Sequence, residues 1–297
     1  MIRLMRYLKP YALQVAGVLI LTLAGVFSEL LLPRLMGNIV DRGVATGDLK
    51  YIYNTGGVML AIAILGTAAT VISRYMSSKA AVAFGRDLRS DVFKTVESFS
   101  LNEIDKMGTS SLITRTTNDV SQMQNITIMS MRMMIRAPFM MIGGIIMATS
   151  TNLELSKVLL ISAPVLVVVI WIIGVKGFPL FKEIQKKIDD LNRVLRESLT
   201  GIRVIKAFNK TDYEKKRFNQ ANRDLTEAAL KVGRIMALMM PILNVVLNFT
   251  LVGVIWYGSS LIEIRGLEVG ELMAFIQYVS QIMFSLIMVS MIFVMLP

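Results

Sequence analysis

Long uncharged stretches decide the fold, and the clearest of them is VLLISAPVLVVVIWIIGV, residues 158–175. A helix rises about 1.5 Å per residue, so about 20 apolar residues cross the roughly 30 Å hydrocarbon core of a bilayer. Five other uncharged stretches have a similar or greater length: residues 10–28, 51–73, 137–153, 235–262 and 272–297. With 54% hydrophobic residues, the chain is too apolar for an ordinary soluble domain.

These stretches predict an all-α membrane protein with six transmembrane helices. The predicted spans are residues 11–38, 51–78, 126–150, 157–178, 235–262 and 271–297. The third is the weakest of them, because Arg132 and Arg136 stand at the entrance of its apolar stretch.

Positive charge is concentrated between the spans and orients them. Of 32 Lys and Arg residues, three (Arg3, Arg6 and Lys9) lie in residues 1–9, eight in 79–136 and fifteen in 176–234. Cytoplasmic loops retain Lys and Arg, so both termini and both long loops are predicted in the cytoplasm. The net charge of +11 comes almost wholly from these blocks. It therefore predicts a lipid bilayer with anionic headgroups as partner, and no nucleic acid.

The residue types that are missing exclude several kinds of chemistry. The chain has neither Cys nor His, which removes disulfides, thiolate nucleophiles, imidazole acid–base chemistry and nearly all zinc or haem ligation. It also has no G-x-x-x-x-G-K-[ST] phosphate loop. We therefore predict no catalytic, metal or cofactor-binding residues in this stretch of chain.

Two cytoplasmic segments, residues 79–125 and 179–234, are predicted to be helical arms. In the first, Leu88, Val92, Val96 and Phe99 recur at helical spacing, and a similar pattern starts at Phe181 in the second. Each arm has a turn signal near its middle. Gly108 is expected to end one helix, with a hydroxyl of the following Thr and Ser residues capping the next. In the second arm, Thr211 and Glu214 have capping-box spacing.

Each arm is thus predicted to be a helical hairpin with a short polar tip. A plain cytoplasmic loop is the alternative, but two arms of matched length favour a docking surface.

The arm tips and their flanks resemble the two intracellular loops of ABC exporters. The similar segments are FSLNEIDKMG (99–108) with LITRTTNDV (112–120), and ESLTGIRVIKAF (197–208) with the Tyr-Glu and Arg-Phe pairs that follow. YLKPY (7–11) and IVD (39–41) are similar as well. The whole chain, residues 1–297, resembles the transmembrane type-1 domain of bacterial multidrug-type half-transporters, including heterodimeric ones.

This resemblance implies a domain-swapped dimer with six transmembrane helices per subunit. It implies a second half-transporter, identical or not, and ABC ATPase domains at the arm tips. A nucleotide-binding domain, with its ATP and Mg, is expected after residue 297. The expected location is the inner membrane of a bacterial cell.

The resemblance also implies short coupling helices at the tips. The first comprises Phe99, Ser100, Leu101, Asn102, Glu103, Ile104, Asp105 and Lys106. The second comprises Phe208, Asn209, Lys210, Thr211, Asp212, Tyr213 and Glu214. They would fit grooves on the ATPase domains, whose closure would swing the arms and switch the direction in which the cavity opens.

Polar residues inside the spans are candidates for a substrate cavity, because such residues are costly in a membrane. They are Glu29, Asn244, Asn248, Gln277, Gln281 and Ser285. Glu29 could meet a cationic substrate or have a structural role. For the others, hydrogen bonding between helices, worth about 0.6–2 kcal/mol, is an equal alternative.

The sequence therefore predicts the substrate-translocating part of an ATP-driven exporter of hydrophobic or amphipathic compounds, of multidrug or lipid type. An importer or secondary transporter is less favoured, because no clear internal repeat or pair of broken spans is found. A second alternative is a scaffold or regulator that does not transport and uses the arms only to bind partners.

Overall fold

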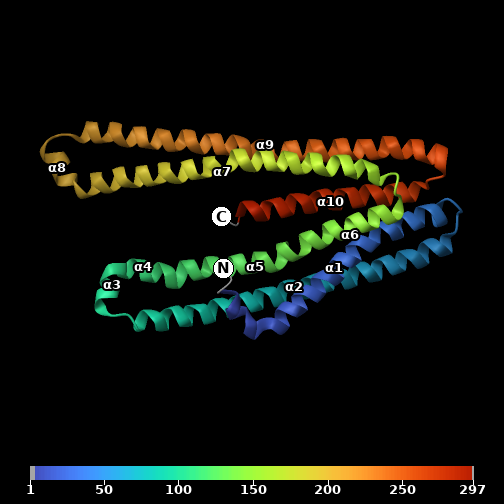
Figure 1. The fold of residues 1–297 in the computed structure, drawn as a ribbon, viewed down its shortest axis with the longest axis horizontal. Coiled ribbons are helices and arrows are strands. Elements are labelled where there is room, and N and C mark those ends of the chain that lie inside the picture. Colours follow the sequence, from blue (N-terminus) through green and yellow to red (C-terminus); the bar gives the residue numbers. More distant parts are fainter. Residues whose placement is uncertain (1–3, 296–297) are drawn as a thin grey trace. The chain divides into compact units, whose positions relative to one another are not determined.

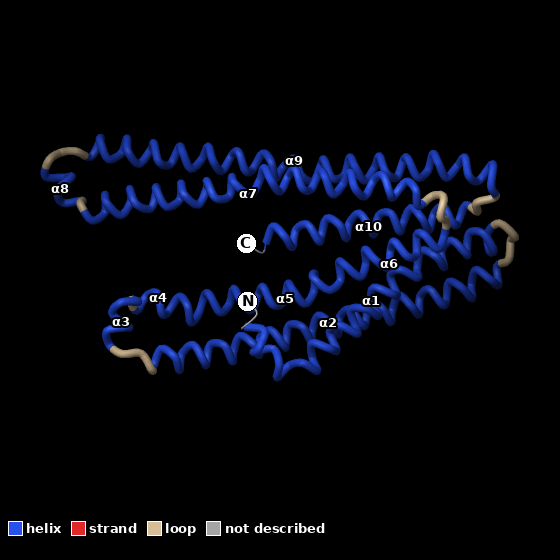
Figure 2. Tube along the Cα trace, viewed as in Figure 1, coloured by secondary structure: helices blue, strands red, loops and turns tan. Residues whose placement is uncertain are grey.

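Helices joined by short turns make up the chain, as the computed structural model of residues 4–295 shows (Figures 1 and 2). A 3₁₀ segment, Leu4–Tyr11, leads into the first helix. The α-helices are α1 (Ala12–Asn38), α2 (Leu49–Glu97), α3 (Leu101–Met107), α4 (Thr109–Thr114), α5 (Val120–Met129), α6 (Ile135–Thr151), α7 (Ser156–Thr200), α8 (Ile202–Ala207), α9 (Thr211–Arg265) and α10 (Val269–Met295). Arg3 and the last two residues of the sixth predicted span, 296–297, lie outside the described residues.

In the part of the chain that the structure describes, three π-helical segments interrupt or extend this pattern. They are Ile39–Val44 after α1, Arg115–Asp119 between α4 and α5, and Ser130–Met134 between α5 and α6. Single π-turns inside helices occur frequently at functional sites. The third of them directly precedes α6, whose second residue is Arg136.

Within residues 4–295, six helical segments are long and apolar enough to cross a membrane. They are Arg6–Val44, Leu49–Glu97, Thr109–Thr151, Ser156–Thr200, Thr211–Ile264 and Val269–Val289. The predicted all-α fold with six spans is therefore confirmed, and the chain is a multi-pass membrane protein. The exact residues at which each span enters and leaves the bilayer stay a prediction.

Helices α2, α7 and α9 are much longer than a membrane is thick. They contain 49, 45 and 55 residues. At about 1.5 Å per residue they measure roughly 70 to 80 Å, more than twice the hydrocarbon core. Each arm is thus a direct continuation of membrane helices, with α3 and α4 at the tip of the first arm and α8 at the tip of the second (Figure 1).

The chain divides into two compact units, which are described separately. The first unit contains the residues up to 157 together with 253–293. Within it α1 packs against α2 and α6, and α2 packs against α5. The first arm has an apolar core where α2 meets α5, formed by Phe84, Leu88 and Val120.

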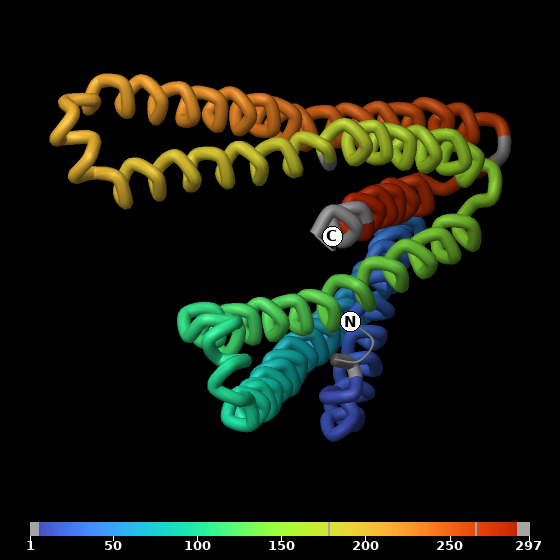
Figure 3. The backbone as a smooth tube through the Cα atoms, turned by 60° about the vertical axis from the view of Figure 1, so that its left-hand side comes forward, coloured from blue at the N-terminus to red at the C-terminus, as the bar shows by residue number. Residues whose placement is uncertain are grey.

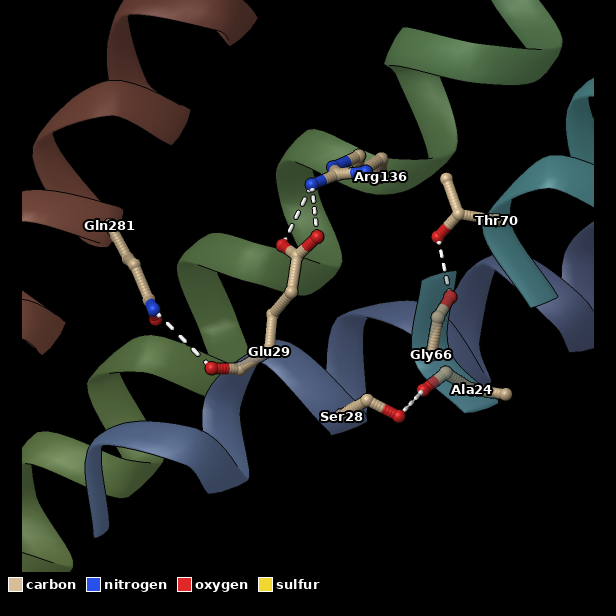
Figure 4. Close-up of polar contacts among 7 residues, drawn as sticks. All are labelled: Ala24, Ser28, Glu29, Gly66, Thr70, Arg136 and Gln281. Atoms are coloured by element: carbon tan, nitrogen blue, oxygen red, sulfur yellow. Dashed lines mark hydrogen bonds and ion pairs between the residues drawn. The ribbon is translucent and has the colours of Figure 1, made fainter. Parts of the chain in front are cut away.

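Small residues allow α1 and α2 to approach closely. A Cβ atom on Gly66 of α2 would lie 2.5 Å from the Cβ atom of Ser28 of α1. The hydroxyls nearby are satisfied by their own helices: Ser28 donates to the carbonyl of Ala24, and Thr70 to that of Gly66, both at 2.9 Å (Figure 4). Small side chains at helix interfaces are typical of membrane helix packing.

The second unit consists mainly of residues 158–252. Its helices α7 and α9 lie side by side (Figures 1 and 3). Lys187 of α7 binds Asp224 of α9 at 2.8 Å, and Gln220 donates to the same carboxylate at 2.8 Å. The ammonium group of Lys187 lowers the pKa of the Asp224 carboxyl, and the Asp224 carboxylate raises the pKa of Lys187.

Candidate functional site

The tip of the first arm is a short helix with a capping box. The predicted tip, Phe99–Lys106, coincides closely with α3, Leu101–Met107. Both the backbone N–H and the hydroxyl of Ser100 donate to the Glu103 carboxylate at 2.8 Å, which lowers the pKa of Glu103. Gly108, at φ +75°, ends α3 as predicted. It is also the N-cap of α4, so the expected hydroxyl cap is wrong: the helix restarts at once on the glycine itself.

The tip of the second arm differs from the prediction. The short helix is α8, Ile202–Ala207, rather than Phe208–Glu214. Phe208, Asn209 and Lys210 form the turn, and α9 begins at Thr211. The shift follows from Asn209, whose φ of +52° ends the helix, because Asn tolerates this left-handed conformation better than most residues.

The predicted capping box at Thr211 and Glu214 is also wrong. The Glu214 carboxylate reaches across to α7, where the Ser198 hydroxyl donates to it at 2.9 Å. Glu214 thus binds Ser198 of the neighbouring helix in place of Thr211, the partner that the spacing predicts.

Both tips expose apolar side chains outside the predicted spans. Leu101 is 81% exposed, Phe208 72% and Tyr213 66%. That these tips dock on another protein stays a prediction, made from the resemblance to ABC exporters.

Inside the predicted spans, Glu29 of α1 forms an ion pair with Arg136 (Figure 4). One guanidinium nitrogen of Arg136, on α6, lies 2.7 Å from both carboxylate oxygens of Glu29. The side chains of Arg136 and Glu29 are 30% and 36% exposed, so the pair is neither fully buried nor free. Glu29 lies nine residues before the end of its predicted span, and Arg136 ten residues after the start of its own.

Sequence reasoning missed Arg136 as the partner of Glu29. A signal was available, because a carboxylate and a guanidinium within predicted spans are costly alone and tend to pair.

The neighbouring Arg132 binds neutral groups of α2: it donates to the hydroxyl of Ser77 at 3.2 Å, to that of Ser78 at 2.7 Å and to the carbonyl of Arg74 at 3.2 Å.

Helix α10 joins the same cluster through Gln281. Its amide nitrogen donates to the backbone carbonyl of Glu29 at 3.4 Å (Figure 4). Next to it, the buried Tyr278 donates its hydroxyl hydrogen to the carbonyl of Leu30 at 3.0 Å. The structure therefore brings together two of the predicted cavity residues, Glu29 and Gln281.

The other predicted cavity residues lie elsewhere. Ser285 is buried and donates to carbonyls of its own helix, those of Gln281 and Ile282. Gln277 is exposed on α10. Asn244 and Asn248 are exposed on α9 in the second unit, where the Asn248 amide donates to the carbonyl of Asn244 at 2.8 Å.

The start of α10 also contacts the end of α1 and the π-helical segment Ile39–Val44 that follows it. Asp41 accepts a hydrogen bond from the backbone N–H of Gly270 at 2.6 Å. A Cβ atom on Gly270 would lie 2.2 Å from the carbonyl oxygen of Gly37, so only glycine fits there. Together with Tyr278 and Gln281, this contact fixes α10 along α1.

The profile of one protein family, described as the ABC transporter transmembrane region, matches residues 15–286. The chain belongs to the ABC transporter transmembrane family. An uncharacterized ABC transporter ATP-binding protein of Mycobacterium tuberculosis is 39% identical to this transmembrane region over 295 residues, which is 99% of the chain and 50% of the relative. A protein of Bacillus subtilis with the same description is 35% identical over 277 residues, 93% of the chain and 48% of the relative.

A more distant relative is named an ATP-dependent lipid A-core flippase, from Nitrosococcus oceani. It is 24% identical over 274 residues, which is 92% of the chain and 46% of the relative. The transmembrane region thus spans about half the length of the curated relatives it matches.

Proposed function

We propose that this chain is the substrate-translocating part of an ATP-driven exporter of hydrophobic or amphipathic compounds. The single observation that carries the proposal is the continuity of α2, α7 and α9 from the predicted spans to tips with exposed apolar side chains. An unbroken helix transmits a displacement of its tip to its membrane segment. An ATPase domain seated on the tips would therefore move the walls of the membrane cavity.

The relatives support an ATPase as the motor. The Mycobacterium tuberculosis and Bacillus subtilis proteins are described as ATP-binding and are about twice as long as the stretch that matches this chain. In our proposal, ATP and Mg bind in a nucleotide-binding domain that follows residue 297, and two transmembrane halves form the working transporter. Both termini face the cytoplasm of a bacterial cell, in agreement with the distribution of Lys and Arg.

The polar cluster in the membrane supports an amphipathic substrate. The pair of Glu29 and Arg136 has no net charge, yet each side chain is about one-third exposed. Such a pair can contact a polar group of a substrate without holding a small ion as strongly as an unpaired carboxylate would. In this proposal Glu29, Gln281 and Gln277 of the first unit contribute to the cavity.

The test is transport by the full-length protein in proteoliposomes. We expect amphipathic fluorescent compounds to accumulate inside inverted vesicles when ATP and Mg are added together, and not when either is left out. The absence of ATP-dependent transport of any hydrophobic or amphipathic compound, with the arms still binding an ATPase, would favour the scaffold alternative.

A further inference from the structure

A cluster of four side chains joins α7 to α9 directly behind the tip of the second arm. The Arg217 guanidinium of α9 binds the Glu197 carboxylate of α7 and lies 3.8 Å from that of Glu214. Glu214 in turn accepts the hydrogen bond from Ser198 of α7. The last turn of α7 and the first two turns of α9 are thus tied together on either side of α8. We call Glu197, Ser198, Glu214 and Arg217 the tip brace.

Apolar packing does not hold this end of the arm. Between residues 195 and 227 no residue is buried, and the nearest buried side chains are Val194 and Ala228. The first arm likewise has no buried residue between positions 89 and 111, and its apolar core at Phe84, Leu88 and Val120 lies away from its tip. Across this stretch the tip brace joins the last turn of α7 to the first two turns of α9, on either side of α8.

A cavity of about 450 Å³ lies between the helices immediately behind the brace, lined by Arg193, Lys216, Gln220 and their neighbours. Most of its cationic side chains already bind carboxylates: Lys187 binds Asp224, Arg193 binds Asp190 and Arg217 belongs to the brace. The lining as a whole stays positively charged, because it contains four cationic side chains and two carboxylates. Two of these ion pairs, Lys187 with Asp224 and Arg217 with Glu197, join α7 to α9, whereas the pair of Arg193 and Asp190 lies within α7.

We propose that Arg217 is a positioning residue for coupling in the proposed exporter: through Glu197 and Glu214 it makes the tip of the second arm rigid enough to transmit force. The proposal rests on the function proposed above. A guanidinium suits this role because its planar fork can bind two carboxylates at once, which a lysine ammonium does less specifically. Without Arg217, two carboxylates would face each other and the tip would move independently of the shaft.

The first test measures the tip itself in the full-length protein. In R217Q, hydrogen exchange of the α8 amides is expected to rise by up to about fivefold, the factor that an exposed ion pair produces. R193Q is the matched control: it removes an arginine from a pair with Asp190 that lies within α7 and does not join the two helices. It should leave exchange in α8 unchanged. Equal protection of α8 in wild type and R217Q would overturn the proposal.

The second test measures coupling as substrate molecules transported per ATP hydrolysed. R217Q is expected to lower this ratio several-fold, whereas R193Q keeps it. Because the chain contains no cysteine, E197C with R217C can replace the ion pair by a covalent bridge, in a full-length background freed of other cysteines. Coupling should be low before a short bifunctional thiol reagent is added and should recover afterwards.

The outcomes separate this inference from the proposed function. If the wild-type protein shows no ATP-dependent transport, the proposed function fails. If it transports and R217Q has the wild-type ratio, or if bridging the two cysteines restores nothing, the positioning role of Arg217 fails while the proposed function stands.

Discussion

The ion pair between Glu29 and Arg136 allows a quantitative prediction by a double-mutant cycle. Unit charges about 4 Å apart attract by roughly 4 kcal/mol at an effective dielectric constant of 20, and desolvation offsets part of this. Removing one partner of a fully buried pair costs about 3–5 kcal/mol. Because each side chain is about one-third exposed, we expect E29Q and R136Q each to lower the free energy of unfolding by about 2–3 kcal/mol.

The double variant should lose less than the sum of the two single variants. Once both charges are gone, neither is left unpaired in the membrane, so the coupling energy should be about 1–3 kcal/mol. The assay is reversible unfolding of the purified protein in mixed micelles by a denaturing detergent. Arg132 supplies the control, because its partners on α2 are neutral: R132Q combined with E29Q should be additive. Additivity of E29Q and R136Q within about 0.5 kcal/mol would refute the pairing.

Three further predictions follow from the geometry. G270A should lower the free energy of unfolding by about 1–3 kcal/mol, because the added Cβ atom overlaps the backbone of α1. G57A is the control in the same unfolding assay: its added Cβ atom would meet no atom within 4 Å, so it should be neutral or slightly stabilising. The pKa of Glu103 is lowered from its ordinary value of 4.5, so its cap stabilises α3 fully above pH 4.5 and is lost as the pH falls through the lowered pKa. Hydrogen exchange of the α3 amides, corrected for the intrinsic rate, should therefore rise in wild type as the cap is lost. S100A should weaken this pH dependence. R136Q should shift transport toward cationic compounds, because it frees a carboxylate; an equal change for neutral and cationic compounds would contradict the cavity role.

The sequence predicts the helices well because the signals are local. Uncharged stretches of membrane length give six spans, and helical periodicity between them gives the arms. Gly108 ends α3 for a reason that is visible in the sequence, since glycine adopts positive φ without strain. The resemblance to ABC exporters implies the first tip at Phe99–Lys106, which lies within two residues of α3 at Leu101–Met107.

The remaining features depend on contacts between distant residues. Glu29 and Arg136 are 107 positions apart, and spacing within one helix cannot show that they meet. At the second tip, the local capping signal of Glu214 loses to a cross-helix contact with Ser198, and the left-handed turn at Asn209 moves the short helix upstream. Contacts between helices thus decide which partner Glu214 binds, and the spacing of residues along one helix cannot show this.

The central claim is that the arm tips carry the motion of an ATPase to the membrane spans. Its most direct test places a cysteine at Phe208, in a cysteine-free full-length protein, opposite a set of cysteines on the ATPase domain. We predict that cross-linking with a rigid, short reagent proceeds with high yield at this position, and that a long flexible reagent abolishes coupling while ATP hydrolysis continues. Efficient ATP-driven transport with the tip held away from the ATPase domain by the long reagent would contradict the account.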